Sequence, residues 1–173
     1  QYVRPWRLKN KAPVTIRPIR PEDEPMMVKF HETLSEESVY HRYFSALHLE
    51  QRIAHERLTR ICFNDYDREI ALVAEHKESK TEDKKILGVG RLSKIHGLNE
   101  AEFALLISDE WQNLGLGLEL LKQLVAIGRA EKLDRIFGEI LADNHAMRNI
   151  CKKLNFKITT DADQRTCAAQ FIF

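Results

Sequence analysis

The chain of 173 residues is 43% hydrophobic and 31% charged, which is typical of a globular domain and not of a disordered or fibrous chain. Its 27 lysines and arginines nearly balance its 26 aspartates and glutamates, and the net charge of +1 argues against nonspecific nucleic-acid binding. Because no apolar run approaches the roughly 18 residues of a membrane span and no signal-peptide pattern opens the chain, we expect neither nucleic acid nor a membrane as a partner.

Taken in chain order, the residues predict alternating segments of helix and strand. Residues 1–13 combine basic side chains with two prolines and show no periodicity, which predicts a linker or an amino-terminal arm before a domain over 14–173. Alternating or continuous apolar residues predict strands over 14–19, 69–76, 86–95, 100–108, 135–142, 156–160 and 168–173. Helical spacing and capping residues predict helices over 21–33, 35–44, 49–61, 117–132 and 144–154. The charged stretch 77–85 predicts the solvated tip of a hairpin, and the fold class is α+β with a mixed, mostly antiparallel central sheet.

The cysteines and histidines carry no sign of a metal or disulfide framework. Cys62, Cys151 and Cys167 are odd in number and widely spaced, and no C-x-x-C pair suggests zinc. The seven histidines also lack a metal-ligand spacing. We therefore expect no metal and a reducing, cytoplasmic location.

The stretch 109–121 is the part of the sequence that points most directly to chemistry. An apolar strand ends at Ser108, Gly115 and Gly117 follow, and a helix begins at once. Helix-start amides lack intrahelical partners and glycine allows a ligand close to the backbone, so the amides from Leu114 to Leu118 are candidates for binding a pyrophosphate. Leu120 stands where a dinucleotide fingerprint needs its third glycine, and no Gly-Lys-Ser/Thr of a Walker loop is present. Two glycines that merely start a helix remain an alternative on these residues alone.

Two motifs in the correct order resemble those of the GNAT acetyltransferases. The segment 112–117, QNLGLG, matches their Q/R-x-x-G-x-G/A loop. The later helix motif N-x-x-A-x-x-x-Y-x-K-x-G-F is matched by Asn144, Met147, Cys151, Lys153, Asn155 and Phe156. The segment 14–44 further resembles the acetyltransferase domain of bacterial Pat-type protein lysine acetyltransferases. A chain that begins at Gln1 is consistent with a fragment of such a protein, in which a covalently linked domain often lies upstream.

The resemblance implies a GNAT fold with six to seven strands and about four to five helices, and acetyl-CoA as co-substrate. It implies that backbone groups of Leu106, Ile107 and Ser108, together with Asn144, meet the pantetheine arm. The pyrophosphate would be held by the loop residues Gln112, Leu114, Gly115, Leu116, Gly117 and Leu118. Lys153, or alternatively Arg148, would neutralise a phosphate, although a solvated helix end is as good an explanation of Lys153.

A carboxylate is needed because a lysine amine with a pKa near 10.4 is almost wholly protonated at neutral pH. Glu102 lies near the start of the strand that leads into the glycine loop, and the resemblance implies that it is the general base. On the residues alone, Glu102 could equally mark a solvated strand end. Glu139, which interrupts an otherwise apolar strand, and Glu100, on the same face as Glu102, are rival candidates.

The sequence also departs from the family motif at two positions. Cys151 replaces the tyrosine that often protonates the departing thiolate, so we assign no general acid. Asn155 replaces a glycine and is expected to adopt the same left-handed conformation. The predicted activity is acetyl transfer to lysine side chains of a protein such as an acyl-CoA synthetase. A small-molecule amine acetyltransferase and a non-catalytic acetyl-CoA sensor are the alternatives.

Overall fold

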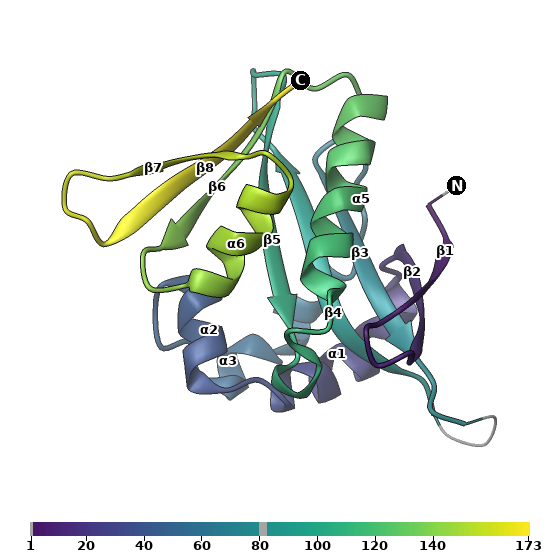
Figure 1. The fold of residues 1–173 in the computed structure, drawn as a ribbon. Coiled ribbons are helices and arrows are strands. Elements are labelled where there is room, and N and C mark those ends of the chain that lie inside the picture. Colours follow the sequence, from purple (N-terminus) through teal and green to yellow (C-terminus); the bar gives the residue numbers. More distant parts are fainter. Residues whose placement is uncertain (1, 80–82) are drawn as a thin grey trace.

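A computed structural model describes residues 2–79 and 83–173, which form one mixed sheet with helices on both faces (Figure 1). The strands are β1 (Arg4–Arg7), β2 (Pro13–Pro18), β3 (Glu69–His76), β4 (Lys85–Lys94), β5 (Glu100–Ile107), β6 (Arg135–Leu141), β7 (Lys157–Thr160) and β8 (Thr166–Ile172). The helices are α1 (Glu24–Glu32), α2 (Glu36–Tyr43), α3 (Leu49–Arg52), α4 (His55–Ile61), α5 (Leu116–Ala130) and α6 (His145–Lys153), with short 3-10 turns at Pro21–Asp23 and Asp109–Trp111.

The sheet has the order β1-β2-β3-β4-β5-β6-β8-β7, and only β5 and β6 run parallel. The predicted α+β class and mostly antiparallel sheet are therefore confirmed. The strand number is eight rather than six to seven, because residues 4–7 pair with β2. The predicted helix over 49–61 is two helices, since the chain turns at Ile53 and Ala54 between α3 and α4. Part of the predicted hairpin tip, residues 80–82, lies outside the described residues.

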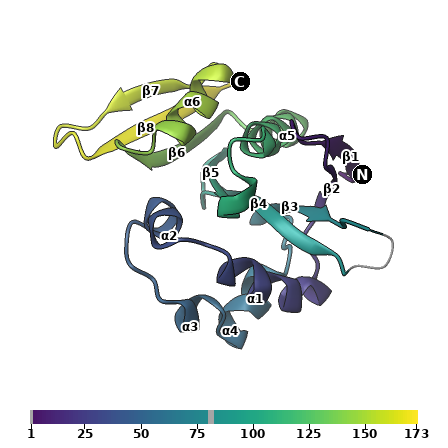
Figure 2. The ribbon, with the colours of Figure 1, turned by 60° about the horizontal axis from the view of Figure 1, so that its bottom comes forward.

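Two hydrophobic cores, one on each face, hold the helices to the sheet. Strand β3 alternates between them: Leu72 faces the core shared with α5 and α6, while Val73 faces the core shared with α1 and α4. A strand buried on both faces reads as a continuous apolar run, which explains the sequence of β3. Figure 2 shows α1 to α4 grouped on one side of the sheet and α5 on the other. Every helix within residues 2–79 and 83–173 is too short or too polar to cross a bilayer.

Asn155 follows α6 with a φ of 65°, so the expected left-handed residue after this helix is confirmed. Its short polar side chain tolerates this conformation better than most residues do. The turn brings the chain back into β7 and sends Phe156 into the core, where its ring packs edge-on against Phe103 at 5.4 Å. This packing attaches α6 and β7 to the central sheet.

Candidate active site

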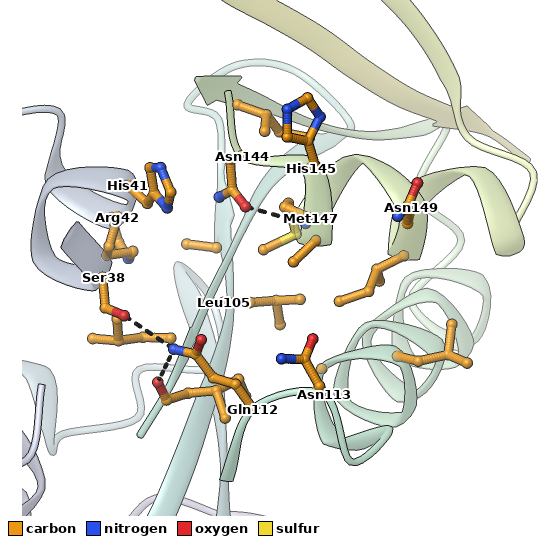
Figure 3. A pocket seen from close by; sticks show the side chains of 18 of the residues that line it. Ser38, His41, Arg42, Leu105, Gln112, Asn113, Asn144, His145, Met147 and Asn149 are labelled. Atoms are coloured by element: carbon orange, nitrogen blue, oxygen red, sulfur yellow. Dashed lines mark hydrogen bonds between the residues drawn. The ribbon is translucent and has the colours of Figure 1, made fainter. Parts of the chain in front are cut away.

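A pocket of about 790 Å³ lies between α2, β5, the glycine loop and α6. Figure 3 shows that Ser38, His41 and Arg42 of α2 face Asn144 and Met147 at the start of α6 across this pocket, with Leu105 and Gln112 between them. The two walls come from segments about 100 residues apart in the chain. The sheet brings the two walls together, because α2 packs against β5 and α6 follows directly after β6, the strand next to β5.

The pocket exists because β5 and β6 pair only at their beginnings. Their parallel register covers Glu100–Glu102 against Arg135–Phe137 and then stops. At that point the ring of Phe103 packs over Gly138, where an added Cβ would lie 2.8 Å from a Phe103 ring carbon. Beyond it the edge of β5 that faces β6 has no strand beside it, so its backbone groups are available to an extended ligand.

The alternation of an antiparallel pair decides which backbone groups of β5 face this gap. The amide of Ser108 donates to the Leu87 carbonyl at 2.8 Å, so the backbone groups of Ser108, and of Leu106 two residues before, are directed to β4. Those of Ile107 and Leu105 face the gap instead. Of the three residues predicted to meet the pantetheine through their backbone, Ile107 alone has its groups on the open edge. Leu106 lines the pocket, whereas Ser108 is buried and its hydroxyl donates to Thr33 Oγ1 at 2.8 Å.

Gln112 connects the strand edge, the glycine loop and α2. Its Nε2 donates to the Ile107 carbonyl at 3.1 Å and to the Ser38 hydroxyl at 3.0 Å (Figure 3). The Gln112 side chain therefore already bonds to the Ile107 carbonyl on the open edge of β5, and it holds the glycine loop against α2. Gln112 was predicted to support the pyrophosphate site, and the structure places it where it shapes the loop from inside the pocket.

The glycine loop places the start of α5 against the pocket. Gly115 has a φ of 88°, a conformation that glycine adopts at no steric cost, and α5 begins at the next residue. The first intrahelical bond runs from the Glu119 amide to the Gly115 carbonyl, so the amides of residues 116–118 have no intrahelical acceptor. Gly115, Gly117 and Leu118 line the pocket, whereas the Leu116 side chain is buried in the core. The Leu114 carbonyl accepts from the Lys9 amide at 3.0 Å.

Helix α6 carries the other predicted ligand-binding residues. Asn144 lines the pocket, and its Oδ1 caps the helix by accepting from the Met147 amide at 3.2 Å. Lys153 is exposed and also lines the pocket, one turn after Ile150, which packs on Gly117. Arg148, the alternative to Lys153, lies outside the pocket lining and donates to the Ala142 carbonyl at 3.0 Å.

Two of the three candidate carboxylates reach the pocket. Glu102 and Glu139 are both exposed and both line it, from the two sides of the point where β5 and β6 diverge. Glu100 lies outside the lining and is ion-paired with Arg135 at 2.8 Å. Glu102 is thus placed at the mouth of the pocket on the strand that leads to the glycine loop.

Several charged residues that line the pocket, notably Lys9, Glu37 and Arg42, are not among the predicted site residues. Burial lowers the pKa of the Arg42 guanidinium, while the nearby Tyr43 and Glu102 favour its charged form. The basic character of residues 1–13 was visible in the sequence, but only the fold places Lys9 beside the glycine loop. Glu37 and Arg42 belong to the helix predicted over 35–44, but only the fold shows that both side chains line the pocket.

Cys151 does not occupy a place from which it could protonate a leaving group. It is fully buried in the core beneath α6 and lies outside the pocket lining, and burial raises its thiol pKa to about 12. Within the described part of the chain, no group of three or more histidine, cysteine or acidic side chains is arranged to hold a metal ion. The side chains that line the pocket include carboxylates, amides, imidazoles and cationic groups.

Comparison with known proteins assigns this arrangement to a family. A family model described as an acetyltransferase (GNAT) domain matches residues 14–157. The acetyltransferase PA5475 of Pseudomonas aeruginosa is 28% identical over 154 residues, covering 88% of this chain and 80% of that protein. Among solved structures, the GNAT domain of S. lividans PAT has a TM-score of 0.85 at 22% identity, covering 99% of this chain and 97% of that one. Mycobacterium smegmatis RimJ in complex with CoA-disulfide has a TM-score of 0.74 at 15% identity, covering 98% and 86%. The chain belongs to the GNAT family of acetyltransferases.

Proposed function

We propose that the protein transfers the acetyl group of acetyl-CoA to the ε-amino group of lysines in a protein acceptor. The observation that carries this proposal is the continuous path from an exposed carboxylate to the glycine loop. Glu102 lies at the mouth, the open edge of β5 leads inward, and the free amides at the start of α5 lie at the far end. A thioester carried on a long pantetheine arm fits this path, with its pyrophosphate at the amides.

The distribution of charge supports an amine as acceptor. Glu102 and Glu139 line the pocket where β5 and β6 diverge, with Arg42 near Glu102, and Asp143 lines it at the loop before α6. Lys9 and Lys153 lie toward the glycine loop, at the end of the pocket that Glu37 and Asp109 also line. Acidic groups attract a protonated amine, and cationic groups attract phosphates. Glu102, Glu139 and Asp143 are all exposed, which suits a lysine presented on the surface of another protein better than a small amine that must be enclosed.

The proposed step is a direct transfer within a ternary complex. At neutral pH only about four in ten thousand lysine side chains are unprotonated, so the carboxylate of Glu102 removes a proton from the ammonium through a water molecule. The amine nitrogen then bonds to the acetyl carbonyl carbon, the carbon–sulfur bond breaks, the thiolate leaves, and the nitrogen gives up its second proton to solvent to become the amide. A free thiol has a pKa near 8.5, so the thiolate takes its proton from solvent without a dedicated acid.

The acceptor protein is part of the proposal. The Pat-type resemblance favours an acyl-CoA synthetase, and the domain would act on it while linked to a further domain upstream. The test incubates the purified chain with radiolabelled acetyl-CoA and either an acyl-CoA synthetase, a mixture of folded proteins, or free polyamines, aminoglycosides and amino acids. We expect label on protein lysines, located by mass spectrometry, and its loss with the variant Glu102→Gln. Label on free amines alone would favour the small-molecule alternative, and tight acetyl-CoA binding without any transfer would favour the sensor.

A further inference from the structure

The amino-terminal arm contributes a wall to the pocket that the acetyltransferase motifs do not include. The family model begins at residue 14, whereas Lys9 lies in the connection between β1 and β2 and lines the pocket. Its amide donates to the Leu114 carbonyl at 3.0 Å, which attaches the arm directly to the glycine loop. The arm is therefore part of the site's architecture.

The position of Lys9 is fixed by its neighbours. Leu8, the residue before it, is 3% exposed and belongs to the core beneath α5. The turn that follows is held by bonds from the Leu8 amide to the Ala12 carbonyl at 3.0 Å and from the Lys11 amide to the Leu8 carbonyl at 2.8 Å. A buried anchor on one side and a closed turn on the other leave the Lys9 backbone little freedom.

The side chain of Lys9 extends over the first residue of the helix start. Its Cε lies 3.6 Å, and its Cγ 3.8 Å, from the point where a Cβ of Gly115 would stand. Gly115 is the residue just before the amides of residues 116–118, so the far end of the Lys9 side chain lies near the start of α5. The Trp6 ring approaches the same point to 3.3 Å, so two side chains of the arm pack against Gly115.

Among the residues that the structure describes, none is a partner of the Lys9 ammonium. Across residues 2–79 and 83–173 it makes no side-chain hydrogen bond or ion pair, and the residue is exposed. Of the acidic residues that flank the loop in sequence, Asp109 accepts from the Ser35 amide at 2.9 Å and Glu119 accepts from Gln123 at 3.0 Å, while Glu110 is exposed and lies outside the pocket lining. A cation held beside a helix start without a counterion is suited to an anion that bridges the two.

We propose that Lys9 binds the diphosphate of acetyl-CoA together with the amides of residues 116–118, so that the amino-terminal arm completes the co-substrate site. This rests on the proposed use of acetyl-CoA and adds to it a ligand from outside the matched family segment. The side chain acts as a charged hydrogen-bond donor on the phosphate oxygens. It takes no part in the acetyl transfer itself.

The test measures the dissociation constants of three ligands by titration calorimetry, with the full 173-residue chain and no acceptor present. The ligands are acetyl-CoA, 3′-dephospho-acetyl-CoA and S-acetyl-pantetheine, which lacks the diphosphate. We expect Lys9→Gln to raise the Kd of the first two about tenfold, as for loss of one exposed charge-assisted contact, and to leave that of the third unchanged. Lys9→Arg should restore most of the affinity, and added salt should reduce the difference between wild type and Lys9→Gln.

Lys11→Gln is the matched control, because Lys11 lies in the same turn, is exposed and does not line the pocket. It should bind all three ligands as the wild type does. An acetyl-CoA Kd within twofold of wild type for Lys9→Gln would overturn the proposal. So would an equal loss for S-acetyl-pantetheine, which would indicate a structural role, or an unaffected dephospho ligand, which would place Lys9 on the 3′-phosphate. No acceptor is present in these titrations, so their outcome does not depend on whether the lysine-transfer assay succeeds.

Discussion

The imidazole Nε2 of His41 lies 3.3 Å from a carboxylate oxygen of Asp143, and this contact joins α2 to the loop before α6 across the mouth of the pocket. Asp143 is 80% exposed at its side chain, so the contact contributes little to the stability of the fold. Its position matters for the proposed function, because the protein acceptor proposed above would approach Glu102 between these two elements.

We expect His41→Asn and Asp143→Asn to change the KM for a protein acceptor several-fold while the acetyl-CoA Kd stays within twofold of wild type. The midpoint of thermal unfolding should change little, because exposed pairs are typically worth under about 1 kcal/mol. Steady-state kinetics on both single variants and the double variant form a cycle. If the two substitutions act additively on KM, the contact itself has no role in acceptor binding.

Glu102→Gln should lower kcat at pH 7 by about 100-fold, because a positioned general base typically contributes 10²- to 10⁴-fold. The defect should shrink as pH rises, since the fraction of unprotonated lysine increases about tenfold per pH unit below its pKa. A pH–rate profile with saturating acetyl-CoA measures both effects. Glu139→Gln is the control, since Glu139 is an exposed carboxylate on the opposite strand of the same pocket. Full turnover of Glu102→Gln at every pH would remove Glu102 from the mechanism.

The sheet and its glycine loop could be predicted because their determinants are local. Strand β5 and helix α5 follow from periodicity, and Gly115 marks the junction between them through its own φ of 88°. Residues 4–7 gave no such signal, because this four-residue edge strand contains Pro5 and shows no alternation of apolar and polar residues. It is a strand because it pairs with β2. The break between α3 and α4 was likewise invisible. There the Arg52 side chain donates to the Leu47 and His31 carbonyls, and Arg57 donates to the Arg52 carbonyl.

The residues of the pocket were predicted in part, because only those in local motifs can be recognised from the sequence. Gly117 and Asn144 lie in motifs whose spacing is readable, Glu102 was predicted from the family resemblance, and the structure brings all three to one pocket. Lys9 and Arg42 reach it from segments that no motif connects to the glycine loop. The direction of backbone groups along β5 also depends on register with β4, and register is a property of the pair and not of either strand alone.

Gly115→Ala should weaken acetyl-CoA binding about tenfold and destabilise the fold by about 1–2 kcal/mol, the usual cost of a left-handed conformation for a residue with a Cβ. The added methyl would also lie 3.3 Å from the Trp6 ring and press the arm away from the loop. Gly97→Ala is a matched control, because Gly97 has a φ of 78° in an open turn. Among the described residues beyond its chain neighbours, no atom lies within 4 Å of the point where its Cβ would stand. Thermal unfolding and calorimetric titration should show a similar destabilisation for both variants and weaker binding for Gly115→Ala alone. Equal affinities would contradict a role of the loop in binding.

Cys151→Ala should leave kcat within about twofold of wild type and lower the stability by about 1 kcal/mol, the order expected for a small cavity in the core. Burial holds the thiol pKa at about 12, so the native protein should also react slowly with iodoacetamide at this position. Steady-state kinetics and mass spectrometry of the alkylated protein measure the two properties. A tenfold loss of kcat with an unchanged fold would show that the thiol serves as the general acid after all.

His31 should make the fold sensitive to mild acid. It is 1% exposed, and burial, together with the charges of Arg57, Arg52, Arg91 and Arg42, lowers its pKa to about 3. Between about pH 3 and about pH 6.5 the unfolded chain binds a proton at this histidine that the folded chain does not bind. The free energy of unfolding therefore decreases as the pH is lowered, by about 2 kcal/mol from pH 7 to pH 5. Urea unfolding at the two pH values should show this loss, and His31→Asn should remove it. His96→Asn, in an exposed turn, should retain it; an unchanged loss in His31→Asn would show that other groups cause the acid sensitivity.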